Sequence, residues 1–204
     1  VADRGGNALA APFTLDFTVR PASDIAPLSG TKAIDRAPGA NPGQLVSFVI
    51  PGITTTTAVA FSVINDSSGT VTVRQVTPFV IDTATQRGFY FVPTDAVTGN
   101  VTIPGDLDGP FLFQIVPVVT GVDLTGVNTT QANFTLSGLG FIEGNGTRYT
   151  IGSVTTIDTS PSFGPDVFST NTRANLSTAF EDGLFGAVVV TTAGGTSAAF
   201  SVGY

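Results

Sequence analysis

The sequence contains no cysteine, histidine, methionine or tryptophan. Without cysteine the chain forms no disulfide bonds, holds no structural thiolate zinc site and has no cysteine nucleophile. Without histidine it lacks the usual general acid or base at neutral pH and the usual transition-metal ligand, so Ser-His-Asp and Cys-His catalytic arrangements are excluded. These absences favour a function other than catalysis.

Positive charge is also scarce. The chain carries a net charge of −7, and only 11% of its residues are charged. A nucleic-acid-binding protein needs a basic patch, and an anionic membrane surface attracts one, so we expect neither partner. No apolar run approaches the roughly 18 residues that a transmembrane helix needs, so membrane insertion is not expected.

Thr, Val, Gly and Ser dominate the remaining composition, with 24 Gly and 13 Pro. Thr and Val favour strands, Gly and Pro end them, and no long segment shows a 3.6-residue period. Apolar strands separated by turn signals are the pattern of a β-sandwich, so we predict an all-β fold. The predicted strands cover residues 45–50, 57–64, 70–76, 88–92, 99–103, 110–116, 118–124, 131–137, 149–151, 153–157, 173–177, 186–192 and 197–202.

We predict a boundary after residue 117, with sandwiches at 25–117 and 118–204 and a separate strand within residues 1–24. Residues 92–117 and 177–204 align as distant repeats, which supports a tandem arrangement. The stretch 21–45 is rich in Pro, Gly and Ala and is expected to be a linker or long loop that opens the next domain.

The N-terminal strand alternates strictly. Phe13, Leu15, Phe17 and Val19 share one face, and polar residues occupy the other. An unpaired strand with an apolar face adds readily to an exposed sheet edge of another molecule. We therefore expect these four residues to act as a donor strand that joins copies of the chain. The alternative is a strand that packs locally.

Three segments resemble bacterial Ig-like modules. Residues 1–20 resemble the closing segment of a Big-type domain, with the turn from Asp3 to Leu9 leading into the final strand. Residues 117–204 resemble an IPT/TIG-type domain through Thr-Leu-Ser-Gly-Leu-Gly-Phe at 135–141 and the closing run at 188–202. Residues 41–117 match more weakly. The resemblance implies tandem Ig-like sandwiches of the kind used as stalks and spacers in adhesins, other surface proteins and extracellular enzymes.

Calcium is the metal that suits the available donors, because Asp, Asn and backbone carbonyls are hard oxygen ligands. Asp106 and Asp108 lie in a Gly-Asp-Leu-Asp-Gly turn, and Asp123 follows the predicted boundary. We expect these three to meet near the hinge if calcium binds. The other interpretation, with no cofactor at all, is that they are turn residues that cap their own backbone.

Two further expectations concern aromatic and amide side chains. Loop 158–172 is the longest irregular segment of the second domain, and its Phe163, Asp166 and Phe168 are the candidate ligand-binding residues. Alternation predicts that Phe89 and Phe91 face a core, that Tyr90 faces away from it, and that Asn133 faces outward.

We therefore expect a structural module or repeat subunit of a bacterial extracellular adhesin stalk or surface fibre. Its partners would be copies of itself or neighbouring Ig-like domains. The first alternative is an Ig-like module that binds a surface glycan or protein. The second is a set of accessory domains of an extracellular enzyme whose catalytic domain lies elsewhere.

Overall fold

The structure is a computed structural model that describes residues 27–65, 69–106, 109–161 and 166–202. The described chain is all-β, as the sequence predicts. Within these ranges no helix is long and apolar enough to cross a membrane. The predicted donor strand, with Phe13, Leu15, Phe17 and Val19, lies outside the described residues, as do Asp108 and Phe163.

Strands β1 to β9 lie in the first half of the described chain. They form the sheets β2-β9-β8, β3-β7-β6 and β4-β5, and isolated bridges at Ala60–Thr102 and Val63–Ala96 tie β4 to the segment around β8. β1 is the exception, because it pairs in the other half. Their bounds are β1 (Thr31–Lys32), β2 (Gly39–Ala40), β3 (Leu45–Val49), β4 (Val59–Asn65), β5 (Thr70–Val76), β6 (Val80–Asp82), β7 (Arg87–Phe91), β8 (Gly99–Val101) and β9 (Phe111–Ile115).

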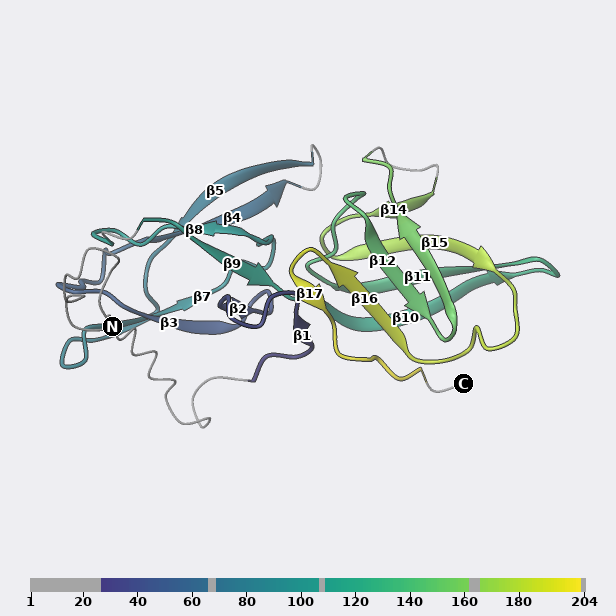
Figure 1. The fold of residues 1–204 in the computed structure, drawn as a ribbon, viewed down its shortest axis with the longest axis horizontal. Helices are drawn as coiled ribbons and strands as arrows, with labels where there is room; N and C mark the ends of the chain where they lie inside the picture. The colour runs from purple at the N-terminus through teal and green to yellow at the C-terminus, as the bar shows by residue number, and fades with distance from the viewer. Residues whose placement is uncertain (1–26, 66–68, 107–108, 162–165, 203–204) are drawn as a thin grey trace, which may run out of the picture.

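The second half forms two larger sheets, β10-β11-β15-β14 and β1-β17-β16-β12-β13. Neighbouring strands in both are antiparallel. The bounds are β10 (Val118–Val127), β11 (Gln131–Leu139), β12 (Thr147–Ile151), β13 (Val154–Asp158), β14 (Val167–Ser169), β15 (Arg173–Ala179), β16 (Val188–Thr192) and β17 (Gly195–Thr196). In Figure 1 these strands occupy the right of the molecule, and β2 to β9 occupy the left.

The buried hydrophobic residues form two clusters. One is drawn from residues 40–115 and centres on Phe61, Tyr90 and Phe113. The other is drawn from residues 119–190 and centres on Phe134, Leu136 and Tyr149, with the two sheets of the second half on either side. The predicted boundary after residue 117 falls between Ile115, the last residue of the first cluster, and Val119, the first of the second.

The face assignment in β7 is partly wrong. Phe89 is buried as predicted, but Tyr90 is 0% exposed and Phe91 is 47% exposed. Gly88 supplies the reason, since a Cβ there would overlap the Tyr90 ring and Ile53, so the glycine leaves the space that the ring fills. The Tyr90 hydroxyl donates a hydrogen bond to the Thr57 carbonyl at 2.9 Å, which satisfies the polar end of the buried ring.

The predicted strand 197–202 is also wrong. Only Gly195 and Thr196 form β17, followed by an isolated bridge between Val188 and Phe200. The Ser197 hydroxyl accepts a hydrogen bond from the Val190 N–H at 3.0 Å, in the place of a backbone carbonyl. The bridge between Val188 and Phe200 is one residue out of register with the pairing of Thr191 and Thr196, and such a shift is the effect of a β-bulge.

The expected linker is instead a structured connection between the halves. β1 pairs with β17, so that Thr31 faces Thr196, while β2 pairs in parallel with β9. Figure 1 shows β1 and β17 together at the middle of the molecule. The Gln114 side chain, which is 0% exposed, accepts from the Ile34 N–H and donates to the Ile34 carbonyl, both at 2.7 Å.

A close backbone approach completes this junction. The Gly194 carbonyl, in the β16–β17 turn, accepts from the Ala33 N–H at 3.2 Å. A Cβ at Gly194 would collide with the Ile115 carbonyl oxygen and the Thr98 hydroxyl, both of which belong to the first half. The two halves therefore meet across a glycine that no larger residue replaces without a shift.

Replacing Gly194 with alanine should destabilise the protein by about 1–3 kcal/mol, because overpacking moves backbone on both sides of the junction. Thermal unfolding followed by calorimetry measures this loss. Gly121→Ala is the matched control, since a Cβ there meets only the Ser137 side chain at ordinary van der Waals distance. Equal unfolding temperatures for the two variants would contradict the tight junction.

Candidate functional site

The outward face of the β10-β11-β15-β14 sheet carries a row of side chains drawn from all four strands. Asp123 on β10 pairs with Thr135 on β11, Thr135 pairs with Asn175 on β15, and Asn175 pairs with Phe168 on β14. Directly paired residues of neighbouring strands point to the same side of a sheet. The row therefore runs from a carboxylate through a hydroxyl and an amide to an aromatic ring.

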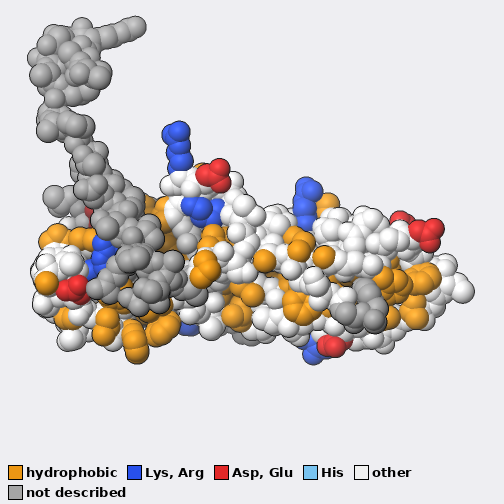
Figure 2. Space-filling view, turned by 90° about the horizontal axis from the view of Figure 1, so that it is seen from below, with side chains coloured by type: hydrophobic (Ala, Val, Ile, Leu, Met, Phe, Trp, Pro, Cys, Tyr) orange, Lys and Arg blue, Asp and Glu red, His pale blue; other side chains and the backbone are white. Residues whose placement is uncertain are grey.

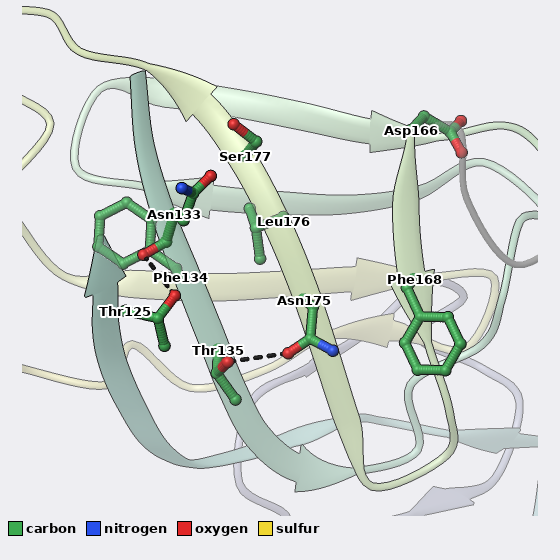
Figure 3. Close-up of a pocket in the computed structure, with 9 residues that line it drawn as sticks. All are labelled: Thr125, Asn133, Phe134, Thr135, Asp166, Phe168, Asn175, Leu176 and Ser177. Carbon is green, nitrogen blue, oxygen red and sulfur yellow. Dashed lines mark hydrogen bonds between the residues drawn. The ribbon is translucent and has the colours of Figure 1, made fainter. Parts of the chain in front are cut away.

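A shallow, open hollow of about 480 Å³ lies on this face. Figure 3 shows the Phe168 ring on β14 at one side, Asn175 and Thr135 on the neighbouring strands, and Asn133 and Ser177 farther along those strands. Phe168 is 40% exposed on this face. The residues that line the hollow are Thr125, Asn133, Phe134, Thr135, Asp166, Phe168, Asn175, Leu176 and Ser177.

Hydrogen bonds fix the polar groups of the hollow. The Thr135 hydroxyl donates to the Asn175 Oδ1 at 2.8 Å, and the Arg173 guanidinium donates to the Thr135 oxygen at 3.5 Å. This bond assigns the amide of Asn175, whose Nδ2 lies on the side toward Phe168 in Figure 3. An amide N–H donor beside an aromatic ring is therefore presented in one orientation.

Asp166 organises the loop beside Phe168. Its Oδ2 accepts from the Thr159 N–H at 2.9 Å and the Ser160 N–H at 3.1 Å, and its Oδ1 accepts from the Val167 N–H at 2.9 Å. The bond from the Thr159 N–H is the main reason that the pKa of Asp166 is lowered to about 2. Asp166 therefore supports the entry into β14, and its carboxylate is occupied by backbone donors.

The structure brings some of the predicted residues together and separates others. Asp123, Asp166 and Phe168 all belong to the second-half sheet or the loop beside it, although Asp123 and Phe168 were assigned to different sites. Asp106 lies exposed after β8, in the first half. In the described ranges no three Asp or Glu side chains group closely enough to hold a metal ion. The proposed triplet with Asp108 and Asp123 stays a prediction.

Sequence reasoning placed the site in a loop, whereas most of its residues lie on strands. The predicted irregular segment 158–172 contains β14, whose pairing with β15 turns Phe168 onto the sheet face. Asn133 faces outward, as predicted, and is exposed. Thr135, Asn175 and Ser177 were missed, although the alternation of polar and apolar residues along 131–137 and 173–177 contains the signal.

Comparisons with known proteins add little. No family model and no curated protein matches the chain. Among solved structures, the chain is similar to SGBP-B from a complex xyloglucan utilization locus in Bacteroides uniformis, with 17% identity and a TM-score of 0.29. The match covers 79% of this chain and 45% of that chain, so this chain spans less than half the length of that structure. A TM-score this low carries no argument about function. The resemblance to IPT/TIG-type and Big-type modules stays a prediction.

The Asp166 carboxyl should titrate near pH 2, well below the ordinary value of about 3.9. Because the folded-state pKa is lowered, the stabilisation from its hydrogen bonds is present above about pH 4 and is lost as the pH falls toward 2. Side-chain carboxyl NMR measures the midpoint, and Asp166→Asn assigns the signal by its disappearance. A midpoint at or above 3.9 would contradict the loop geometry.

Proposed function

We propose that the chain is a non-catalytic module of a bacterial extracellular surface protein, and that it binds a glycan on the outward face of the β10-β11-β15-β14 sheet. The observation that carries this proposal is the cross-strand row Thr135, Asn175 and Phe168, which lines one hollow with hydroxyl, amide and aromatic groups. Glycan binding, which the sequence offers as an alternative to a stalk or fibre subunit, is therefore the function that we put first.

The chemistry of this row suits a sugar. A pyranose ring has an apolar face of C–H groups, which packs on an aromatic ring such as Phe168, and a rim of hydroxyls, which exchange hydrogen bonds with amides and hydroxyls. Binding pockets combine apolar contact area with a few oriented polar groups, and a hollow of about 480 Å³ lies within their usual size range. Its open, shallow form fits an extended chain lying along the sheet.

The charge distribution favours a neutral glycan. The net charge of −7 repels an acidic sugar chain, and among the described residues the face carries the carboxylates of Asp123 and Asp166 and the guanidinium of Arg173. Asn133, Thr135, Asn175 and Ser177 are uncharged. We therefore expect neutral oligosaccharides to bind, and uronic-acid or sialylated chains to be excluded.

Screening the intact chain on an array of neutral and acidic oligosaccharides should yield neutral binders. Phe168→Ala should then weaken the affinity for the best binder by about tenfold or more, because the loss of one contact surface costs on the order of 1.4 kcal/mol. Asn175→Ala should act similarly. Calorimetric titration measures both effects.

Phe180→Ala is the matched control, because Phe180 is 42% exposed, close to the exposure of Phe168, but lies outside the hollow beside Phe185. It should leave the affinity unchanged. The proposal is wrong if no neutral oligosaccharide binds, or if the Phe168 and Phe180 variants bind equally well.

A second candidate, the structural subunit of a stalk or fibre, is favoured by the free edge of β5. Ala60 exchanges two backbone hydrogen bonds with Thr102, and the Ser62 carbonyl accepts one from the Val97 N–H, on the side of β4 away from β5. The residues opposite them on β5 are Gln75 and Val73. Their backbone N–H and C=O groups therefore point away from β4, along an edge that pairs with no other strand in the part of the chain that the structure describes.

This edge lacks the usual protection against strand addition. Thr70–Val76 runs without a register shift and contains no proline, and Val71 and Val73 are 57% and 69% exposed. The charge of Arg74 is held by Asp95 through two contacts of 2.6 Å. By contrast, the edge strand β10 carries two register shifts. The β5 edge is thus suited to accept a strand, and the alternating segment around Phe13 to Val19 is the donor that we propose.

The second candidate predicts self-association. Sedimentation velocity of the full chain should show concentration-dependent oligomers, and removal of residues 1–20 or the substitution Val73→Lys should abolish them. Val127→Lys, at an exposed valine of β10, is the control and should retain them. A full chain that remains monomeric at every concentration tested would exclude this assembly.

A further inference from the structure

A group of polar side chains, three of them buried and Glu143 half-buried, lies beneath the sheet face at one end of the second-half sandwich. Glu143 follows β11, Tyr149 is on β12, Asp158 ends β13 and Ser169 ends β14. Tyr149, Asp158 and Ser169 are each 0% exposed. Four segments thus place two carboxyl groups, a phenol and a hydroxyl around one point in the interior.

Ser169 links the two carboxyl groups. Its N–H and its hydroxyl both contact Oε2 of Glu143, the hydroxyl at 3.0 Å, and the hydroxyl also lies 3.2 Å from Oδ2 of Asp158. One hydroxyl proton serves only one of the two carboxylates at a time. The remaining oxygens therefore decide how the cluster is stabilised.

Those oxygens are buried and lack hydrogen-bond partners. Oε1 of Glu143, Oδ1 of Asp158 and the hydroxyl oxygen of Tyr149 have no partner in the described structure. No Lys or Arg in the described chain forms an ion pair with either carboxyl group. A buried carboxylate without a cation costs several kcal/mol, so a cation bound at this point would stabilise the two carboxylates.

The electrostatics of Asp158 agree with this geometry. Burial is the main reason that the pKa of Asp158 is raised to about 6, and the neighbouring Glu143 carboxylate raises it further, against hydrogen bonds from Gly144 and Ser169. Burial also raises the pKa of the Tyr149 hydroxyl, against the interaction with the Ser169 side chain, which lowers it.

We propose that a hard divalent cation, with the coordination preferences of Ca²⁺, binds between the Glu143 and Asp158 carboxylates. The unpartnered oxygens of Glu143, Asp158 and Tyr149 point to this site, which is distinct from the calcium site expected at Asp106, Asp108 and Asp123. The proposal is independent of glycan binding, because none of its ligands lines the hollow on the outer face.

The donor set selects the class of ion. All available donors are oxygens, and the sequence contains no cysteine or histidine, so zinc and copper lack their preferred ligands. Ca²⁺ takes six to eight oxygens in variable geometry, including water, whereas Mg²⁺ demands a regular octahedron. Two carboxyl groups contributed by separate segments fit the adaptable ion better.

Calcium should raise the unfolding temperature of the chelator-treated full chain by about 5–10 °C at roughly 100-fold excess over its dissociation constant. Glu143→Gln and Asp158→Asn should each abolish most of this rise. Both replacements are isosteric and remove a buried charge, so the calcium-free variants should remain folded by circular dichroism. Asp106→Asn and Asp123→Asn, at the sequence-predicted site, should keep the full rise.

Terbium luminescence gives a second measurement. Because the chain has no tryptophan and three tyrosines, only tyrosine can sensitise bound Tb³⁺, and Tyr149 lies at the site. Excitation of tyrosine should produce Tb³⁺ emission that calcium displaces and that Tyr149→Phe largely removes. The proposal is overturned if calcium leaves the unfolding temperature unchanged, if the carboxyl variants respond like the wild type, or if the emission survives Tyr149→Phe.

Discussion

The close backbone contact at Gly194 and Gly195 is the constraint on which the arrangement of the molecule depends. The β16–β17 turn reaches into the first half, where Gly194 lies against Ile115 and Thr98, and β17 in turn accepts β1 as a neighbouring strand. The chain therefore crosses between the halves twice, through β1 and through the short connection from β9 to β10. These two crossings, together with the buried Gln114, restrict rotation of one half against the other. A single linker would allow such rotation.

This restriction gives the sheet face a fixed direction relative to the long axis of the molecule. Figure 2 shows that charged side chains are few and scattered on the face viewed there, and that hydrophobic side chains recur along the length of the molecule. Four exposed hydrophobic residues lie on or beside β3, β6 and β7. They are Val49 at the end of β3, Phe79 just before β6, Val80 at the start of β6 and Phe91 at the end of β7.

The strands were predictable because alternation and turn residues are local signals. The segment 70–76 is β5 residue for residue, and the predicted strands up to residue 192 lie within a few residues of observed ones. The failures came from side-chain packing and strand pairing, which local alternation does not encode. Tyr90 turns inward because Gly88 leaves space, β1 forms because β17 lies beside it, and strand 197–202 is interrupted because the Ser197 hydroxyl takes the place of a carbonyl. The candidate site failed in the same way, since the row from Asp123 to Phe168 exists only once the strand order is known.

β14 is only three residues long, and its two faces serve different neighbours. Phe168 points outward to the hollow, while the next residue, Ser169, points inward to Glu143 and Asp158. A rotation of this strand cannot move one side chain without moving the other. The strand that presents the ring to the hollow is thus the same strand whose next hydroxyl lies between two buried carboxyl groups, so three residues belong to the surface and to the interior at once.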